Sequence, residues 1–242
     1  MHTLELKNIS VKAGEKLIVD DASFAFKSGE VHIIMGPNGS GKSSLLNAIM
    51  GHPKYAITGG SILLDSEDIT TLPTEKKAKA GLFLSLQHLP EIHGVSMTSF
   101  LHRAYKDQKE SDILPLDFYK KMNTLATEFG IDARFLKGHV NTNLSGGEKK
   151  QSEILQLLAL EPKFAFLDEI DSGVDIDSMK KVYSAINALK AKGIGFILVT
   201  HFVNILEHIH PDMVHVMREG KLVASGGREL AERINKEGFE KI

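Results

Sequence analysis

The chain contains no cysteine among its 242 residues. This absence excludes disulfides, thiol catalysis and an iron–sulfur cluster held by the chain's own thiolates. An excess of charge of one sign is also lacking, because 29 Lys and Arg residues stand against 31 Asp and Glu residues, for a formal net charge of -2. No overall basic field therefore indicates nucleic-acid binding.

Long hydrophobic runs are missing too. Apolar segments such as residues 31–35 and 195–199 are far too short to cross a bilayer, and the first residues lack a signal-peptide pattern. We therefore expect a cytoplasmic protein without direct membrane insertion. Internal repeats, low-complexity tracts and long linkers are also absent from the sequence. The length fits one large α/β domain with an inserted subdomain, or two small domains.

The N-terminal part alternates as strands do. Residues 4–11 and 17–26 carry apolar side chains at strand-like spacing, which predicts an antiparallel β layer. Residues 31–35 then form a short, nearly unbroken apolar run, followed by a glycine-rich segment and a helical pattern over residues 42–50. This order predicts a buried strand, a loop and a helix.

The pattern changes in the middle of the chain. Between about residues 96 and 144 apolar side chains recur at helical spacing, with Lys and Glu between them. Apolar strand patterns return at residues 164–167 and 196–199, as expected for a buried parallel sheet. We therefore expect an α/β core from residues 1–95 and 145–242, interrupted by a helical subdomain over residues 96–144.

The segment after the first buried strand matches Gly-x-x-x-x-Gly-Lys-Ser in full, in the strand-to-helix context that a phosphate-binding loop requires. Its backbone N–H groups would converge on phosphate oxygens, Lys42 would bridge the β- and γ-phosphates, and Ser43 would bind Mg²⁺. The core is thus predicted to be a P-loop NTPase. The expected nucleotide-binding residues are Gly36, Pro37, Asn38, Gly39, Ser40, Gly41, Lys42, Ser43 and Ser44.

Two carboxylates follow the buried strand at residues 164–167. Asp168 and Glu169 would lie beside the phosphate loop if the sheet is wound in the usual way. Asp168 would then hold the Mg²⁺ shell, and Glu169 would act as the base or the orienting group for the attacking water.

A second glycine-rich helix start occupies residues 144–148, and one nucleotide does not need two such anion sites. Taken alone, Ser145 reads as a helix N-cap. The segment resembles the signature Leu-Ser-Gly-Gly-Gln of the ATP-binding-cassette ATPases, with Glu148 as the departure. The resemblance implies a nucleotide-dependent homodimer, in which Ser145 and Gly147 bind the γ-phosphate held by the opposite subunit. The expected signature residues are Ser145, Gly146, Gly147 and Glu148.

The rest of the family pattern follows in order along the chain. By resemblance, Gln87 is expected to contact Mg²⁺ and the attacking water, and His201 is expected to sense the γ-phosphate. The resemblance thus implies three catalytic residues, Glu169, His201 and Gln87. It implies that Mg²⁺ is bound by Ser43, Gln87 and Asp168. It also implies a loop that crosses the dimer interface and contains Asp171, Ser172 and Asp175.

The sequence departs from the family in other places. Residues 10–16 contain no aromatic side chain to stack on adenine, so we expect weak recognition of the base. Ile170 and Asp171 follow Glu169, where many transporter subunits have Pro and Thr. The resemblance also implies that Lys150 pairs with Glu169 when no nucleotide is bound.

Several stretches are similar to one branch of the family, the SufC-like ATPase subunits of the SUF iron–sulfur cluster assembly system. The resemblance implies a SufB/SufD-like scaffold as the partner, and the missing cysteines agree because the cluster ligands would lie on that scaffold. We expect the scaffold to dock near residues 87–96, because this segment leads from Gln87 into the helical subdomain. The stretches are residues 58–60, 90–96, 145–150, 167–177 and 211–216.

Two other functions remain open. The first is the ATP-binding subunit of a membrane transporter, which predicts a Pro-Thr pair after Glu169 and an aromatic residue for adenine. The second is a regulatory clamp that closes on ATP without useful turnover, which Glu169 and His201 argue against.

Overall fold

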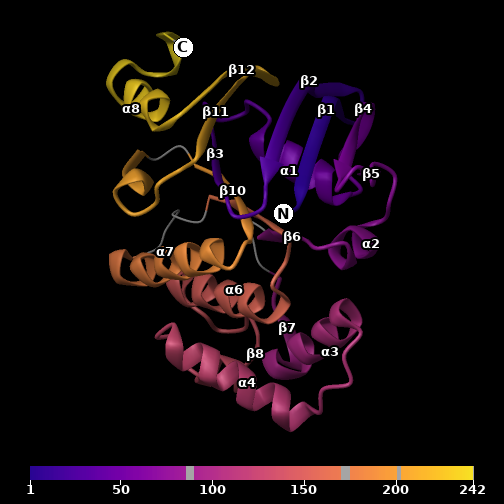
Figure 1. Ribbon diagram of the computed structural model, residues 1–242, viewed down its shortest axis with the longest axis vertical. Coiled ribbons are helices and arrows are strands. Elements are labelled where there is room, and N and C mark those ends of the chain that lie inside the picture. Colours follow the sequence, from indigo (N-terminus) through magenta and orange to yellow (C-terminus); the bar gives the residue numbers. More distant parts are fainter. Residues whose placement is uncertain (86–89, 170–174, 201–202, 242) are drawn as a thin grey trace.

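A computed structural model describes residues 1–85, 90–169, 175–200 and 203–241 of the chain (Figure 1). An antiparallel sheet of order β2-β1-β4-β5 lies at one end of the molecule, as the alternating N-terminal pattern predicted. It is built from β1 (Thr3–Ala13), β2 (Lys16–Lys27), β4 (Ala56–Leu64) and β5 (Glu67–Asp68).

A second sheet, of order β12-β11-β3-β10-β9-β6, forms the centre of the fold. Its strands from β11 to β6 are parallel, and β12 pairs antiparallel with β11 in a hairpin at one edge. The strands are β3 (Val31–Met35), β6 (Leu82–Ser85), β9 (Phe164–Asp168), β10 (Gly195–Val199), β11 (Met213–Arg218) and β12 (Lys221–Gly226).

The central strands are mostly apolar and buried because both faces of the sheet are covered. In β3 every residue is buried, with Ile33 in the core on one face and Ile34 in the core on the other. The core around Ile34 also contains Leu45 and Ile49 of α1 (Lys42–Met50) and apolar residues of the antiparallel sheet. Helix α1 is therefore enclosed between the two sheets, which orients its N-terminus at the end of β3.

The opposite face of the central sheet is covered by helices. These are α6 (Gly146–Leu160) and α7 (Ile176–Ala191), with α3 (Met97–Lys109) and α4 (Pro115–Glu128) beyond them at the far end of the molecule (Figure 1). Part of the helical spacing predicted between about residues 96 and 144 corresponds to α4, which buries Phe118, Met122 and Ala126. The remaining helices are α2 (Thr74–Lys79), α5 (Arg134–Lys137), α8 (Arg228–Glu237) and the 3₁₀ turns at Val203–Glu207 and Phe239–Lys241.

The two ends of the helical segment come together. β7 (Ile92–Ser96) pairs antiparallel with β8 (His139–Val140), which closes the base of the lobe formed by α3, α4 and α5. Helix α6 shares one hydrophobic core with that lobe and with the central sheet, so the boundaries at residues 95 and 145 stay a prediction. Within the described residues, no helix combines the length and the apolar character needed to cross a membrane.

Candidate nucleotide site

The phosphate-binding loop lies between β3 and α1, as the sequence predicted, and its conformation requires glycine at two positions. Gly36 has a φ of 152°, and a Cβ there would lie 2.1 Å from the carbonyl oxygen of Met217 in β11. Gly41 has a φ of 100°, and a Cβ there would lie 2.9 Å from the carbonyl oxygen of Ile18 in β2. The loop is therefore packed against two neighbouring strands, so its shape is preset by the fold.

The ammonium of Lys42 lies inside this loop. Its Nζ donates hydrogen bonds to the carbonyl oxygens of Gly36, at 2.7 Å, and of Pro37, at 3.0 Å. Burial lowers the pKa of Lys42, while the nearby carboxylates of Glu169 and Asp168 raise it. A partly desolvated cation at the start of a helix is well placed to attract phosphate oxygens.

Ser43 and Asp168 meet although they are far apart in the sequence. The Ser43 Oγ donates a hydrogen bond of 3.0 Å to Asp168 Oδ1, because β9 places Asp168 beside the start of α1. Burial raises the pKa of the Asp168 carboxyl, and the Ser43 hydrogen bond and the Lys42 charge partly offset this effect. Two convergent oxygen ligands in a partly buried site fit Mg²⁺, which usually takes one or two protein oxygens together with phosphate and water.

Glu169 has a backbone conformation that is uncommon for its residue type. Its φ is 49°, in the left-handed region, and its backbone N–H donates a hydrogen bond of 2.9 Å to the carbonyl oxygen of Val199 in β10. Such conformations are disfavoured for a residue with a side chain and concentrate at functional sites. The half-buried Glu169 therefore leaves the strand at a sharp angle directly after the candidate metal ligand Asp168.

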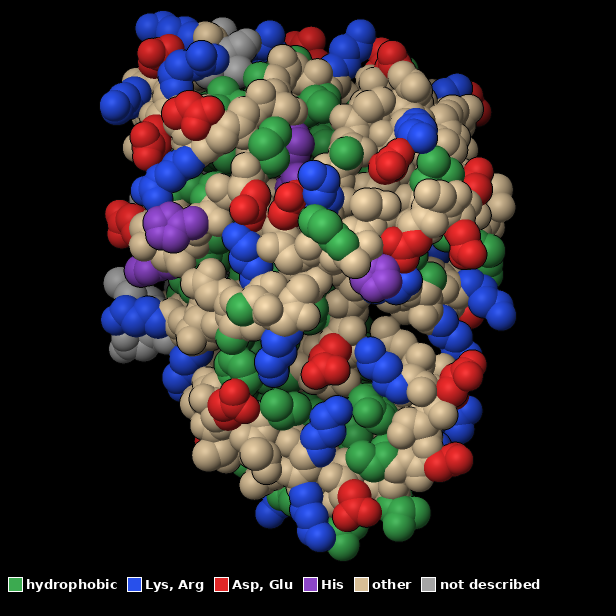
Figure 2. Space-filling model, in the orientation of Figure 1, with side chains coloured by type: hydrophobic (Ala, Val, Ile, Leu, Met, Phe, Trp, Pro, Cys, Tyr) green, Lys and Arg blue, Asp and Glu red, His purple; other side chains and the backbone are tan. Residues whose placement is uncertain are grey.

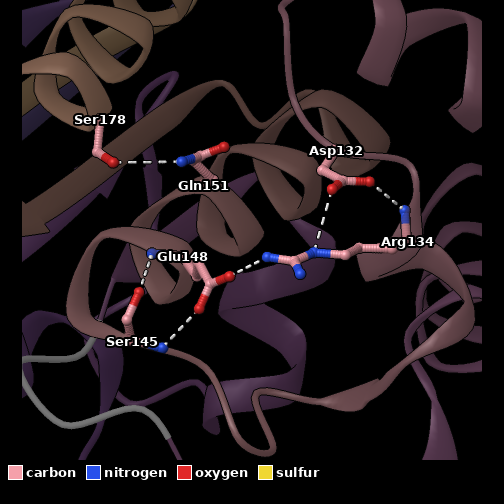
Figure 3. A network of polar contacts seen from close by, with 6 residues as sticks. All are labelled: Asp132, Arg134, Ser145, Glu148, Gln151 and Ser178. Atoms are coloured by element: carbon pink, nitrogen blue, oxygen red, sulfur yellow. Dashed lines mark hydrogen bonds and ion pairs between the residues drawn. The ribbon is translucent and has the colours of Figure 1, made fainter.

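The signature segment caps helix α6. The Ser145 Oγ accepts a hydrogen bond of 3.3 Å from the backbone N–H of Glu148, and Glu148 Oε2 accepts one of 2.8 Å from the backbone N–H of Ser145 (Figure 3). These reciprocal bonds form a capping box. Ser145 is thus an N-cap, and the first turn of α6, with Gly146 and Gly147, follows it at the position expected for an anion site.

Gly147 brings the signature next to the predicted interface loop. A Cβ at Gly147 would lie 2.7 Å from Ser178 Oγ and 2.8 Å from Asp175 Oδ2. Asp175 caps helix α7 by accepting a hydrogen bond of 2.9 Å from the backbone N–H of Ser178. Two of the predicted functional segments are therefore in contact within one subunit, and any side chain at position 147 would separate them.

Other predicted residues are not placed. Gln87, Asp171, Ser172 and His201 lie outside the described residues, so their roles remain predictions. Among the described residues, no hydrogen bond or ion pair joins residues 36–44 of the phosphate loop to residues 145–148 of the signature.

Lys150 has a different partner from the one expected. Its Nζ lies 2.9 Å from Oε2 of Glu153, one turn further along α6, and both side chains are nearly buried. The hydroxyl of Ser85, the last residue of β6, donates a hydrogen bond to the other oxygen of Glu153. The expected pairing with Glu169 is therefore replaced by a local pair, which the i, i+3 spacing in the helix could have predicted.

The sequence reasoning also missed Arg134. Its guanidinium binds both Asp132 and Glu148 (Figure 3). No motif marks this residue. The carboxylate of Glu148, at the signature position where the family has glutamine, could have indicated that a cation lies nearby.

Comparisons with known proteins agree with this geometry. A family model described as ABC transporter matches residues 19–172. The chain is 44% identical to Vegetative protein 296 of Bacillus subtilis (strain 168), over 99% of this chain and 93% of that protein. It is 41% identical to the probable ATP-dependent transporter ycf16 of Antithamnion sp., over 98% of this chain and 96% of that protein.

One solved structure of similar fold is a dimeric ATP-binding cassette in a post-hydrolysis state, bound to ADP and Pi. It superposes with a TM-score of 0.80 at 22% identity, over 93% of this chain and 98% of that one. At this identity the likeness bears on the fold, and it confirms the predicted α/β architecture with a P-loop core.

The family model spans more than half of the chain, and the relatives cover nearly all of it. The phosphate loop, the Ser43–Asp168 pair and the glycine-rich start of α6 lie in the order that this family requires. The chain therefore belongs to the ABC transporter family and is an ATP-binding-cassette ATPase that acts on ATP with Mg²⁺.

Proposed function

We propose that this ATPase works as a nucleotide-dependent homodimer that drives conformational change in a soluble SufB/SufD-like scaffold for iron–sulfur cluster assembly. The observation that carries the dimer is the presence of two helix starts suited to phosphate, at Lys42 and at Gly146, with no described hydrogen bond or ion pair between them. Two copies arranged head to tail would bring the phosphate loop of one subunit to the signature of the other.

In this proposal each composite site divides its roles between two subunits. Lys42 holds the β- and γ-phosphates, and Ser43 and Asp168 hold Mg²⁺, with Gln87 completing the metal shell. Glu169 orients or deprotonates the attacking water, and His201 senses the γ-phosphate. The opposite subunit contributes Ser145, Gly146, Gly147 and Glu148, and the interface loop contributes Asp171, Ser172 and Asp175. The dimeric state of the similar cassette structure supports this arrangement.

A groove beside β6 supports the position of the scaffold. It has a volume of about 530 Å³ and lies among α1, α2, β6, α3 and α6, with Met50, Phe83, Leu84, Phe100 and Leu160 among its lining residues. Figure 2 shows the surface hollowed between the regions of α2 and α3. β6 leads directly into residues 86–89, which contain Gln87, so a partner seated here would lie next to the residue proposed to contact the nucleotide site.

The segment after Gln87 offers exposed apolar side chains to the same partner. In β7, Ile92 and Val95 are 36% and 37% exposed. Closure of the dimer can shift a bound scaffold only by the difference in binding free energy between the open and closed states. A partner that contacts both the groove and β7 spans the junction between the central sheet and the helical lobe, so its contacts change when the lobe moves.

The iron–sulfur assignment is tested by copurification. His93→Asp together with Val95→Asp is expected to remove a soluble iron–sulfur scaffold, identified by mass, from the purified ATPase, while MgATP binding by the isolated subunit is retained. Leu116→Asp is the matched control, because Leu116 in α4 is 63% exposed and lies in a different element. A scaffold that still copurifies with the variant carrying both substitutions in β7 would contradict the proposed docking site.

The transporter alternative is favoured by the names of several relatives, among them a probable ATP-dependent transporter of Antithamnion sp. and a probable ABC transporter ATP-binding protein of Streptococcus pyogenes. The absence of a Pro-Thr pair after Glu169 and of an aromatic residue in residues 10–16 favours the scaffold instead. A partner that copurifies only from detergent-solubilised membranes would establish the alternative and refute our proposal. A regulatory clamp would be recognised by ATP-dependent dimers that do not turn over.

A further inference from the structure

The last signature residue, Glu148, places a carboxylate at the site proposed for a phosphate. Glu148 lies in the first turn of α6, and its Oε2 accepts the backbone N–H of Ser145 at 2.8 Å. This bond, from a backbone amide at a helix N-terminus, lowers the pKa of the Glu148 carboxyl, so the side chain is ionised at neutral pH. A glutamine at this position would make the same hydrogen bond without a charge.

The charge of Glu148 stabilises the helix but opposes the proposed ligand. A negative charge in the first turn is favourable for the helix dipole. The γ-phosphate of a bound ATP is also negative, and it would approach the same helix N-terminus from the opposite subunit. An uncompensated Glu148 would therefore weaken the binding of the triphosphate by repulsion.

Arg134 supplies a positive charge that offsets this repulsion in part, because the guanidinium is shared between Glu148 and Asp132. Its Nη2 donates a hydrogen bond to Glu148 Oε1, the oxygen that Ser145 does not use (Figure 3). Asp132 holds Arg134 in place, because Asp132 Oδ1 accepts the backbone N–H of Arg134 at 2.8 Å and Asp132 Oδ2 lies 3.1 Å from its Nε. The planar guanidinium can satisfy both carboxylates at once, which an ammonium on a flexible chain does less well.

The arrangement also fixes the orientation of Glu148. With Oε2 on Ser145 and Oε1 on Arg134, the carboxylate is directed along the start of α6 toward α5. Ser145 Oγ stays bonded to the backbone of Glu148, so the capping box and the ion pair form one connected network. Loss of Arg134 would leave the carboxylate charged and held only by its hydrogen bond from Ser145.

We propose that Arg134 is a positioning residue for the composite site: it orients Glu148 and offsets part of its charge, so that the signature helix of one subunit accepts the γ-phosphate held by the other. This inference rests on the proposed homodimer. It explains how a carboxylate can replace the neutral glutamine of the family signature in this chain.

The test compares Arg134→Gln with the double variant Arg134→Gln/Glu148→Gln. For Arg134→Gln we expect the ATP concentration that gives half-maximal hydrolysis to rise about fivefold, the scale of one charge at a helix terminus. Hydrolysis at saturating ATP and ATP binding by the isolated subunit, measured by calorimetry, should stay near wild type. The double variant should reach half-maximal hydrolysis at the same ATP concentration as Glu148→Gln alone, because the carboxylate whose charge Arg134 offsets is then absent.

Salt and a matched control separate this role from a structural one. The Arg134→Gln defect should shrink at about 0.5 M salt, since screening weakens repulsion between exposed charges. Arg103→Gln removes an equally positive side chain from the same lobe, where Arg103 lies 3.5 Å from Asp107, and it should leave hydrolysis unchanged. A defect that persists in the Glu148→Gln background, or that is insensitive to salt, would overturn the inference.

Dimer formation distinguishes a failure of the Arg134 role from a failure of the proposed homodimer. If Glu169→Gln forms MgATP-dependent dimers but Arg134→Gln behaves as wild type, only the role of Arg134 is wrong. If Glu169→Gln stays monomeric with MgATP at high protein concentration, the composite site itself is wrong.

Discussion

A buried pair of histidines makes the stability of the central sheet sensitive to acid. His215 in β11 is 5% exposed, its Nε2 lies 3.0 Å from Nδ1 of His32 in β3, and its Nδ1 lies 2.8 Å from Ser225 Oγ in β12. Phe24 and Phe26 of β2 contact the His215 ring through edge-to-face geometry. The imidazole is thus enclosed by aromatic rings, and water does not stabilise its charged form.

Burial, and then the neighbouring His32, lower the pKa of His215 from 6.5 to about 4. The folded state therefore binds fewer protons than the unfolded state between these values. The contribution of neutral His215 to the free energy of unfolding is fully present above pH 6.5 and is lost as the pH falls toward 4. The gap in pKa corresponds to about 3 kcal/mol of unfolding free energy.

The perturbation is His215→Phe, which keeps an aromatic ring beside Phe24 and Phe26 but cannot take up a proton. At pH 7 the variant should be less stable by about 1–3 kcal/mol, because the buried ring nitrogen of His32 loses its hydrogen-bond partner. At pH 4 the variant should gain about 3 kcal/mol relative to the wild type, so the order of stability should approach equality or reverse.

Urea unfolding followed by far-UV circular dichroism at both pH values measures this change. Other groups also bind protons as the pH falls, among them Glu153 and Asp168, whose pKa values burial raises. The informative quantity is therefore the difference between variant and wild type, from which those groups cancel. His52→Gln, at an exposed histidine, is the control. A stability difference for His215→Phe that does not depend on pH would refute the reasoning.

Four further predictions concern the nucleotide site. Lys42→Ala should abolish ATP binding in calorimetry, because backbone N–H groups cannot replace the charge of the ammonium; unchanged affinity in a folded variant would disprove the phosphate-loop role. Glu169→Gln should retain ATP but slow hydrolysis about a hundredfold or more in a steady-state assay, and it should accumulate as a dimer. Lys150→Met should lower the free energy of unfolding by about 3–5 kcal/mol at pH 8, since Glu153 then lacks its counter-ion. This loss should shrink as the pH falls, because burial raises the pKa of Glu153 and a protonated carboxyl needs no partner. GTP should compete with ATP in a filter-binding assay, as residues 10–16 offer no aromatic ring to stack on adenine.

The local elements were readable from the sequence because each depends on nearby residues. The nearly unbroken apolar run of β3 predicts a buried strand, and Gly36 and Gly41 after it predict a phosphate-binding loop. Together with Lys42, they were sufficient to predict both the fold class and the nucleotide. The helical lobe was predicted for the same reason, since the spacing of Tyr119, Met122 and Ala126 is a property of one helix.

Contacts between distant segments were decided only by the tertiary structure. Ser43 meets Asp168 because the strand order β3-β10-β9 brings the ends of two separate strands to one edge, and no local pattern specifies that order. The contact of Gly147 with Asp175 likewise depends on the packing of α6 against α7.

The identity of a charged side chain's partner was the hardest feature to read from sequence. Lys150 binds Glu153 where Glu169 was expected, and Arg134 reaches Glu148 although no motif marks it. A long flexible side chain can reach several carboxylates, so the sequence predicts that a charge needs compensation. Which carboxylate it binds depends on distances of a few ångströms that are set when the sheet, the helices and the lobe pack together.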